Sequence, residues 1–364
     1  MPRKGPTLAA FAALGLFWGA WASVLPSVQL ATHVSKGTLG LALLFVTLAA
    51  IPMMLFVAGP LVDRFGVRAV TITCACFAAA STLPGLAASL PVLIVALAAT
   101  GAATGAMDVA INASAGRIEA VSKRRLMPLA HGLYSVGVLA GAVGAGLARG
   151  AGAGREAILL GVSVAIALVA VWTAGDSGEV SAPEAHGIRF ARALVAIGLI
   201  GAAAFVVEGG IESWSALFLE RQLHAHPAVS GLGPGFFGGS MAIGRFWGQW
   251  ARLDDRALLI GGGLVATAGC LLAATAPSSP LALAGFALGG LGVSLNAPIV
   301  FGAGGRRSAS GVATVTTLGY GGLLIGPPLV GGVAQASSLR VSFVVLAAVA
   351  AAAATAAARV RWTA

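Results

Sequence analysis

The sequence predicts an all-α polytopic membrane protein with twelve transmembrane helices in two pseudo-symmetric six-helix bundles. The mean hydropathy is +0.94, and charged residues make up 9% of the 364 residues, against roughly a quarter in soluble domains. Long apolar runs recur along the whole chain, and about 20 such residues cross the ~30 Å of hydrocarbon in a bilayer. These runs are continuous, whereas the strands of a membrane β-barrel alternate apolar and polar residues. The third observation is a repeat between the two halves.

Twelve spans fit the sequence, at residues 7–30, 38–61, 69–89, 91–115, 127–148, 156–174, 191–217, 231–251, 257–276, 280–303, 310–334 and 340–359. The longest polar interruption, residues 175–192, lies between spans 6 and 7 and divides the chain almost in half. We therefore predict an N-terminal bundle at 1–175, a cytoplasmic linker at 176–190 and a C-terminal bundle at 191–364.

The positive charges predict the orientation of the chain. With the N-terminus inside, 17 of the 22 Lys and Arg residues fall in the inner segments, as the positive-inside rule requires. Both termini are then cytoplasmic in a multi-pass protein of the cell membrane. Topology explains the net charge of +10, which in a soluble protein would suggest nucleic-acid binding.

The sequence lacks the motifs that are typical of catalytic and metal sites. The three cysteines lie inside apolar runs without metal-site spacing, and no Ser/His/Asp cluster or HExxH motif is present. We therefore expect no catalytic residue, no metal and no cofactor, so the protein is not expected to be an enzyme.

Small residues repeat between the halves at a nearly constant offset of 184 or 185 positions. The matched sets are Gly101, Gly105, Asp108 and Asn112 with Gly285, Gly289, Gly292 and Asn296, and Gly137, Gly141 and Gly146 with Gly322, Gly326 and Gly331. Small residues at such spacing let helices approach closely in lipid. With 52 glycines in the chain, coincidence is the alternative to duplication. Two parallel six-helix halves are typical of transporters that bind solute near the midplane.

The stretch GPLVDRFGVR, residues 59–68, lies between spans 2 and 3. It resembles the signature loop of the major facilitator superfamily, Gly-x-Leu-x-Asp-Arg-x-Gly-x-Arg/Lys, with matches at Gly59, Leu61, Asp63, Arg64, Gly66 and Arg68. The resemblance implies the fold of that superfamily over the whole chain. We interpret this Gly-rich turn as a gate, in which Asp63 caps a helix end or pairs with a cation on a neighbouring helix in the closed state. Alternatively, Arg64 and Arg68 only fix the topology.

Asp108 is the sharpest functional candidate, because ionisable groups inside a membrane span are costly and mark functional sites by default. The stretch MDVAIN resembles span 4 of fucose-permease-like proton symporters, in which an acid precedes an Asn by four residues. The resemblance implies that Asp108 carries the proton and that Asn112 forms a hydrogen bond with the substrate. Span 1 lacks the acid of those symporters, and a purely structural Asp108 is the alternative.

Other polar and aromatic residues complete the predicted site. His131 lies near the depth of Asp108 and could form a proton relay with it or a local hydrogen bond. Glu208 and Glu212 share one face of span 7 and could bind a cationic or hydroxylated substrate, or form an outer gate with an arginine. The predicted proton-coupling residues are Asp108, His131 and Glu208; the predicted substrate-binding residues are Asn112, Tyr134, Glu212, Asn296, Tyr320, Trp18 and Trp21.

The favoured function is secondary active transport of a small polar or sugar-like solute by alternating access, with protons as a possible coupling ion. The alternative is efflux of amphipathic compounds by proton antiport. A passive channel fits poorly with an internal repeat and a gate-like loop. The expected partners are a small-molecule substrate, protons and the lipid bilayer, without nucleic acid, and we expect a monomer.

Overall fold

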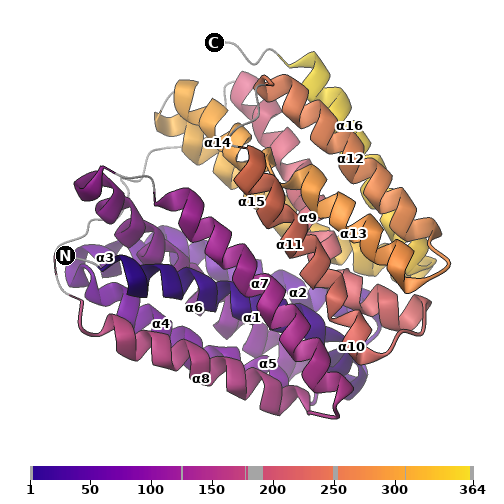
Figure 1. Cartoon of the computed structure of the whole chain (residues 1–364), viewed down its shortest axis with the longest axis horizontal. Helices are drawn as coiled ribbons and strands as arrows, with labels where there is room; N and C mark the ends of the chain where they lie inside the picture. The colour runs from indigo at the N-terminus through magenta and orange to yellow at the C-terminus, as the bar shows by residue number, and fades with distance from the viewer. Residues whose placement is uncertain are drawn as a thin grey trace. The chain divides into compact units, whose positions relative to one another are not determined.

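The computed structural model describes residues 3–123, 126–176, 178, 192–248, 253–307 and 309–360, and every regular element in these ranges is a helix (Figure 1). The first half contains α1 (Lys4–Thr32), α2 (Lys36–Pro52), the π-helix η1 (Met53–Ala58), α3 (Gly59–Phe65), α4 (Arg68–Ser81), α5 (Leu83–Leu86), α6 (Leu90–Ser122), α7 (Met127–Gly150) and α8 (Arg155–Thr173). The second half contains α9 (Arg192–Gln222), α10 (Pro227–Ser230), α11 (Leu232–Gly248), α12 (Asp255–Thr275), α13 (Ser279–Val293), α14 (Asn296–Arg307), α15 (Ala309–Ala336) and α16 (Leu339–Arg359).

The helices confirm the predicted all-α membrane fold. Within the described residues, eleven helical segments are long and apolar enough to cross a membrane. The remaining predicted span, residues 231–251, contains α11, which has 17 residues; residues 249–251 of this span lie outside the described residues. Most of the predicted linker 176–190 also lies outside them.

The chain forms two compact units. Unit 1 comprises Met1–Ser35, Ala42–Pro183 and His226–Gly235, and unit 2 comprises Lys36–Leu41, Glu184–Ala225 and Phe236–Ala364. Each unit thus contains most of one predicted bundle together with a short segment from the other half of the sequence. The first residues of α2 pack in unit 2, and α10 with the start of α11 packs in unit 1. A division of the chain at the linker stays a prediction.

Unit 1 contains a glycine seam between α1 and α7, which pack along each other. A Cβ at Gly15 or Gly19 would overlap the backbone of α7, and a Cβ at Gly137 or Gly141 would overlap the backbone of α1. Two helices can approach this closely only where neither carries a side chain. The four glycines therefore fix the α1–α7 contact.

Unit 2 repeats this seam between α9 and α15, which also pack along each other. A Cβ at Gly322 would overlap the carbonyl oxygen of Ala202, and one at Gly326 would lie 2.8 Å from that of Val206. In unit 1 the matching glycines, Gly137 and Gly141, face Ala12 and Leu16. The predicted correspondence of spans 5 and 11 thus extends to their partner helices.

Spans 4 and 10 match less well than the sequence suggests. On α6, Gly101 and Gly105 face Val46 and Ala50 of α2. On α13, Gly285 and Gly292 face α12, at Ala273 and Ala266, so the aligned glycines pack against non-corresponding helices. The equal spacing of these small residues therefore does not imply equal packing.

Three local features differ from the predicted spans. The loop predicted at residues 59–68 is mostly helix, because α3 continues to Phe65 and the chain turns only at Gly66 and Val67. Predicted span 2 contains the π-helix η1, and predicted span 10 is interrupted between α13 and α14 at residues 294–295. In contrast, α15 is one continuous helix from Ala309 to Ala336, although Pro327 and Pro328 inside it donate no backbone hydrogen bonds.

Candidate functional site

Asp108 lies in unit 1 on α6, on the face that packs against α2 and η1. Gly101 and Gly105 of this face meet Val46 and Ala50, so continuing the register by one turn places Asp108 beside the start of η1. The Asn112 side-chain amide donates hydrogen bonds to the Asp108 carbonyl oxygen (2.9 Å) and to Oδ1 (3.1 Å). Asp108 makes no ion pair with any other described residue. The acid and the amide are therefore one polar pair.

The remaining predicted residues of unit 1 lie on α7 and α1. His131 is exposed, and its ring lies edge-on to Phe11 at 5.4 Å between centroids. Tyr134 is half-buried on the same helix. On α1, Trp21 is buried, whereas Trp18 is half-buried and packs edge-on against Phe17. The hydrogen bonds of Asp108 run to Asn112, and the proposed relay to His131 stays a prediction.

Unit 2 contains a charged group formed by α9 and α11. Arg245 Nη2 lies 3.7 Å from Glu208 Oε1, and its Nε donates to the Ser294 carbonyl oxygen at 3.4 Å. Glu212 follows Glu208 by one helical turn and interacts electrostatically with Glu208 and Arg245. Both carboxylates are half-buried. Sequence reasoning identified the two acids, but it left Arg245 outside the predicted site because Arg245 lies near a span end.

Two further predicted substrate residues lie elsewhere in unit 2. Asn296 begins α14, directly after the interruption of span 10, and is 7% exposed. Its side-chain amide donates to the Gly201 carbonyl oxygen at 3.5 Å, and it lines a water-sized cavity of about 20 Å³. The Tyr320 ring stacks on Phe205, with 6.2 Å between ring centroids.

The residues of the predicted gate lie on α3 and the turn that follows it. Gly66 has a φ of 54°, which glycine adopts without strain, and its N–H donates to the Val62 carbonyl oxygen at 2.8 Å. Asp63, Arg64 and Arg68 are exposed, and Gly59 is half-buried at the start of α3. The pairing of Asp63 with a cation stays a prediction.

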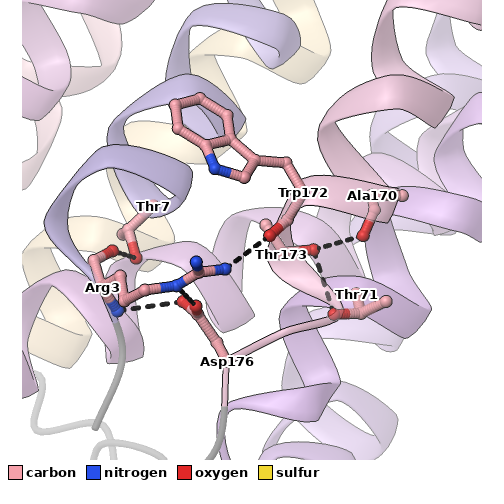
Figure 2. Close-up of polar contacts among 7 residues, drawn as sticks. All are labelled: Arg3, Thr7, Thr71, Ala170, Trp172, Thr173 and Asp176. Carbon is pink, nitrogen blue, oxygen red and sulfur yellow. Dashed lines mark hydrogen bonds and ion pairs between the residues drawn. The ribbon is translucent and has the colours of Figure 1, made fainter.

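Sequence reasoning missed an ion pair that joins the start of α1 to the end of α8 (Figure 2). The Asp176 carboxylate accepts from Arg3 through the backbone N–H, at 2.9 Å, and through the guanidinium Nε. Arg3 Nη2 also donates to the Trp172 carbonyl oxygen at 2.7 Å. Two residues further on, the Gly178 carbonyl oxygen accepts from the Val67 N–H at 3.1 Å. This segment therefore holds both the N-terminus and the turn after α3.

We expect Asp176→Asn to lower the free energy of unfolding by about 1–2 kcal/mol, because the Asp176 side chain is only 2% exposed and loses its charge-assisted bonds. Thermal unfolding in detergent measures the effect as a shift of about 1–3 °C. Asp255→Asn is the control: Asp255 pairs with Arg306 but is 34% exposed, and an exposed pair contributes less than about 1 kcal/mol. Equal shifts for both variants would contradict this ranking.

A second missed contact holds α10 in unit 1. Arg149 near the end of α7 donates from Nη1 to the Ser23 carbonyl oxygen at 2.7 Å and from Nε to Ser27 Oγ at 3.0 Å. It also donates to Ser230 Oγ at 3.3 Å. A Cβ at Gly231 would lie 2.6 Å from the Ala142 carbonyl oxygen. Arg149 and the glycine contact thus seat this segment on α1 and α7.

The comparisons with known proteins support the superfamily resemblance found in the sequence, whereas the resemblance to fucose-permease-like symporters stays a prediction. The profile described as Major Facilitator Superfamily matches residues 7–320. An uncharacterised MFS-type transporter of Yersinia pestis is 32% identical over 356 residues, covering 93% of this chain and 90% of the relative. Membrane protein MosC of Rhizobium meliloti is 32% identical over 337 residues, covering 89% and 82%.

Solved structures show the same fold. A bacterial homologue of the human lysosomal transporter Spinster, in an inward-facing and occupied conformation, aligns with a TM-score of 0.72 at 17% identity, covering 98% of this chain and 96% of that one. The nucleoside transporter NupG aligns with a TM-score of 0.73 at 14% identity, covering 98% of each chain. Together with the family match, these findings show that the chain belongs to the major facilitator superfamily, as a membrane transporter.

Proposed function

We propose that the protein is a proton-coupled symporter of a small polar or sugar-like solute, working by alternating access of two six-helix bundles with both termini cytoplasmic. The proposal rests on the surroundings of Asp108. This residue lies inside a membrane span, and the described residues provide only the Asn112 amide as a partner. An ionised carboxylate without a counter-ion is costly inside a membrane, and taking up a proton removes that cost.

Other residues are proposed to share this work. His131 and Glu208 would take part in proton transfer. The polar and aromatic groups that would contact the solute are Asn112, Tyr134, Glu212, Asn296, Tyr320, Trp18 and Trp21. Asn112 already donates to Asp108, so a change in the protonation of Asp108 would change the hydrogen bonds that Asn112 can offer to the solute. This link is the proposed basis of coupling. The α3 turn, with Gly59, Asp63, Arg64, Gly66 and Arg68, would act as the inner gate.

We expect Asp108→Asn to abolish proton-driven uptake while leaving solute exchange at equal pH in place. A screen of sugars, other polar metabolites and lipophilic cations for thermal stabilisation of the purified protein identifies the solute. In proteoliposomes, uptake driven by a pH gradient should fall by about 100-fold in the variant, a loss typical of removing an essential proton carrier. Exchange of internal for external solute should change by only a few fold, since it needs no net proton movement.

Asp255→Asn is the control for this experiment, because it removes an acid that pairs with Arg306 outside the proposed site. If the Asp108→Asn variant takes up solute at the wild-type rate under a pH gradient, Asp108 is not the proton carrier. Stabilisation by lipophilic cations alone, with proton movement opposite to theirs, would instead support efflux by antiport.

A further inference from the structure

Three polar side chains form a stripe along one face of α9. Glu208, Glu212 and Ser215 stand at positions i, i+4 and i+7, which span about 60° of the helix circumference. Gly210 points to the opposite face, where a Cβ would lie 2.9 Å from the Leu346 side chain of α16. The stripe therefore faces away from α16, on the side where Arg245 of α11 approaches Glu208.

The charges of this stripe do not balance. Arg245 contributes one positive charge, and its contacts are Glu208 and the Ser294 carbonyl oxygen. Glu212 interacts electrostatically with Glu208 and Arg245, yet it makes no hydrogen bond or ion pair with any described residue. When all three groups are ionised, the stripe carries a net charge of −1. Inside a membrane-spanning bundle such a charge is costly, and either a bound cation or a proton on one of the carboxylates removes that cost.

Ser215 provides a second observation, independent of the acids. It is 0% exposed, and within the described part of the chain its Oγ has no hydrogen-bond partner. A buried hydroxyl group without a partner costs free energy, and serines inside helices commonly avoid this cost by donating to the carbonyl oxygen four residues earlier. Ser215 lies one turn beyond Glu212 on the same face of α9, where side chains three residues apart are neighbours.

We propose that the solute carries a primary ammonium group, which binds between Glu212 and Ser215. The Glu212 carboxylate is its counter-ion, and Ser215 Oγ accepts one of its N–H hydrogen bonds. One ligand group thereby supplies the missing positive charge and the missing hydroxyl partner, while Arg245 stays with Glu208. This inference rests on the proposed function, in which Glu212 contacts the solute, and it narrows the solute class to amines.

The test uses ethanolammonium chloride as the probe on the purified full-length protein. Thermal unfolding is compared with sodium chloride and with tetramethylammonium chloride at equal ionic strength. Ethanolammonium should raise the melting temperature by about 2 °C once its concentration exceeds its dissociation constant tenfold. Tetramethylammonium has no N–H group and should leave the melting temperature at the value measured in sodium chloride. Equal melting temperatures in all three salts would overturn the proposal.

Carbodiimide labelling of the wild-type protein gives a second measurement that needs no variant. Mass spectrometry follows the loss of unmodified Glu212 and counts both products, the acylurea and the ethanolamide that forms when the amine displaces urea from the activated carboxyl group. Ethanolammonium should slow this loss by about fivefold or more and sodium should not. Unchanged labelling with ethanolammonium would overturn the proposal, because an ion bound to Glu212 must shield it.

Three variants test whether the ethanolammonium effect arises at this stripe. Glu212→Gln should lose the ethanolammonium shift, and Ser215→Ala should weaken binding about tenfold, as expected for one hydrogen bond to a charged group. Glu220→Gln, which changes an acid two turns further along the same helix, is the matched control and should keep the full shift. Retention of the shift by Glu212→Gln would overturn the assignment to this stripe.

The result is separable from that of the proposed function. Ethanolammonium binding is measured without a pH gradient, whereas the test of symport depends on Asp108 in unit 1. A neutral sugar that is taken up with protons, combined with no response to ethanolammonium, would overturn the amine and leave symport standing. An ethanolammonium response without proton-driven uptake would overturn symport and leave the amine proposal standing.

Discussion

Replacing Gly141 with alanine is expected to lower the melting temperature of the protein by about 4 °C and to reduce the yield of folded protein. A Cβ at this position overlaps the carbonyl oxygen of Leu16 on α1. Because the obstacle is backbone, no side-chain rotation relieves it, and α1 and α7 must move apart. Overpacking costs typically 1–3 kcal/mol and occasionally more. A clash between two helix backbones belongs at the upper end, at about 3 kcal/mol, and the temperature shift follows from that value.

Gly144→Ala is the matched control, since Gly144 lies on the same helix and no atom would come within 4 Å of its Cβ. Alanine favours helix over glycine by roughly 1 kcal/mol in soluble helices, so this variant should be neutral or slightly stabilised. Unit 2 offers the same comparison between neighbours, with Gly322→Ala as the clash and Gly321→Ala as the control. Thermal unfolding in detergent measures all four variants. Equal shifts of the melting temperature for the two variants of a pair would contradict the close backbone contacts at the glycine seams.

The sequence was sufficient for the helices and for the glycine faces of spans 5 and 11, because both depend on local information. A run of about 20 apolar residues has few stable alternatives to a helix in a membrane. Repeated glycines at helical spacing predict a close approach between helices, and Gly137 and Gly322 make one. The partner helix cannot be read from spacing, which explains why Gly101 and Gly285 face non-corresponding helices.

Interruptions of helices escaped prediction because a proline in an apolar run does not reliably mark where the helix is interrupted. The π-helix η1 follows Pro52, but Pro327 and Pro328 lie within an unbroken α15. The interruption before Asn296 falls at Ser294 and Leu295, and Pro298 in the first turn of α14 cannot donate to the Ser294 carbonyl oxygen. Tertiary packing therefore decides which apolar runs stay regular.

In the candidate site the acids were predictable, whereas their partners were not. Asp108 and Asn112 are four residues apart, so the spacing itself brings them together. The partners Arg245 of Glu208 and Asp176 of Arg3 are distant in sequence. Such pairs form only when the fold places their helices side by side, and periodicity within one helix carries no information about them.

Arg149→Gln is expected to release the segment around α10 from α7 while the rest of unit 1 stays folded. The variant loses donors to the Ser23 carbonyl oxygen, Ser27 Oγ and Ser230 Oγ. Of these bonds, only the one to Ser230 joins Arg149 to the α10 segment; its loss costs about 1.5–3 kcal/mol, which corresponds to roughly 10- to 100-fold more frequent local opening. Hydrogen exchange measured by mass spectrometry should show this increase for the peptide covering residues 226–235.

Arg155→Gln tests whether the effect is specific to that contact. Arg155 begins α8 in the same unit and donates to the carbonyl oxygens of Gly85 and Ala87, so its loss should speed exchange near α5 and leave α10 unchanged. Faster exchange at 226–235 in both variants would indicate general loosening of unit 1. Slow exchange at 226–235 in Arg149→Gln would instead show that the close contact of Gly231 with Ala142 suffices. In either case Arg149 would not be what holds the segment in place.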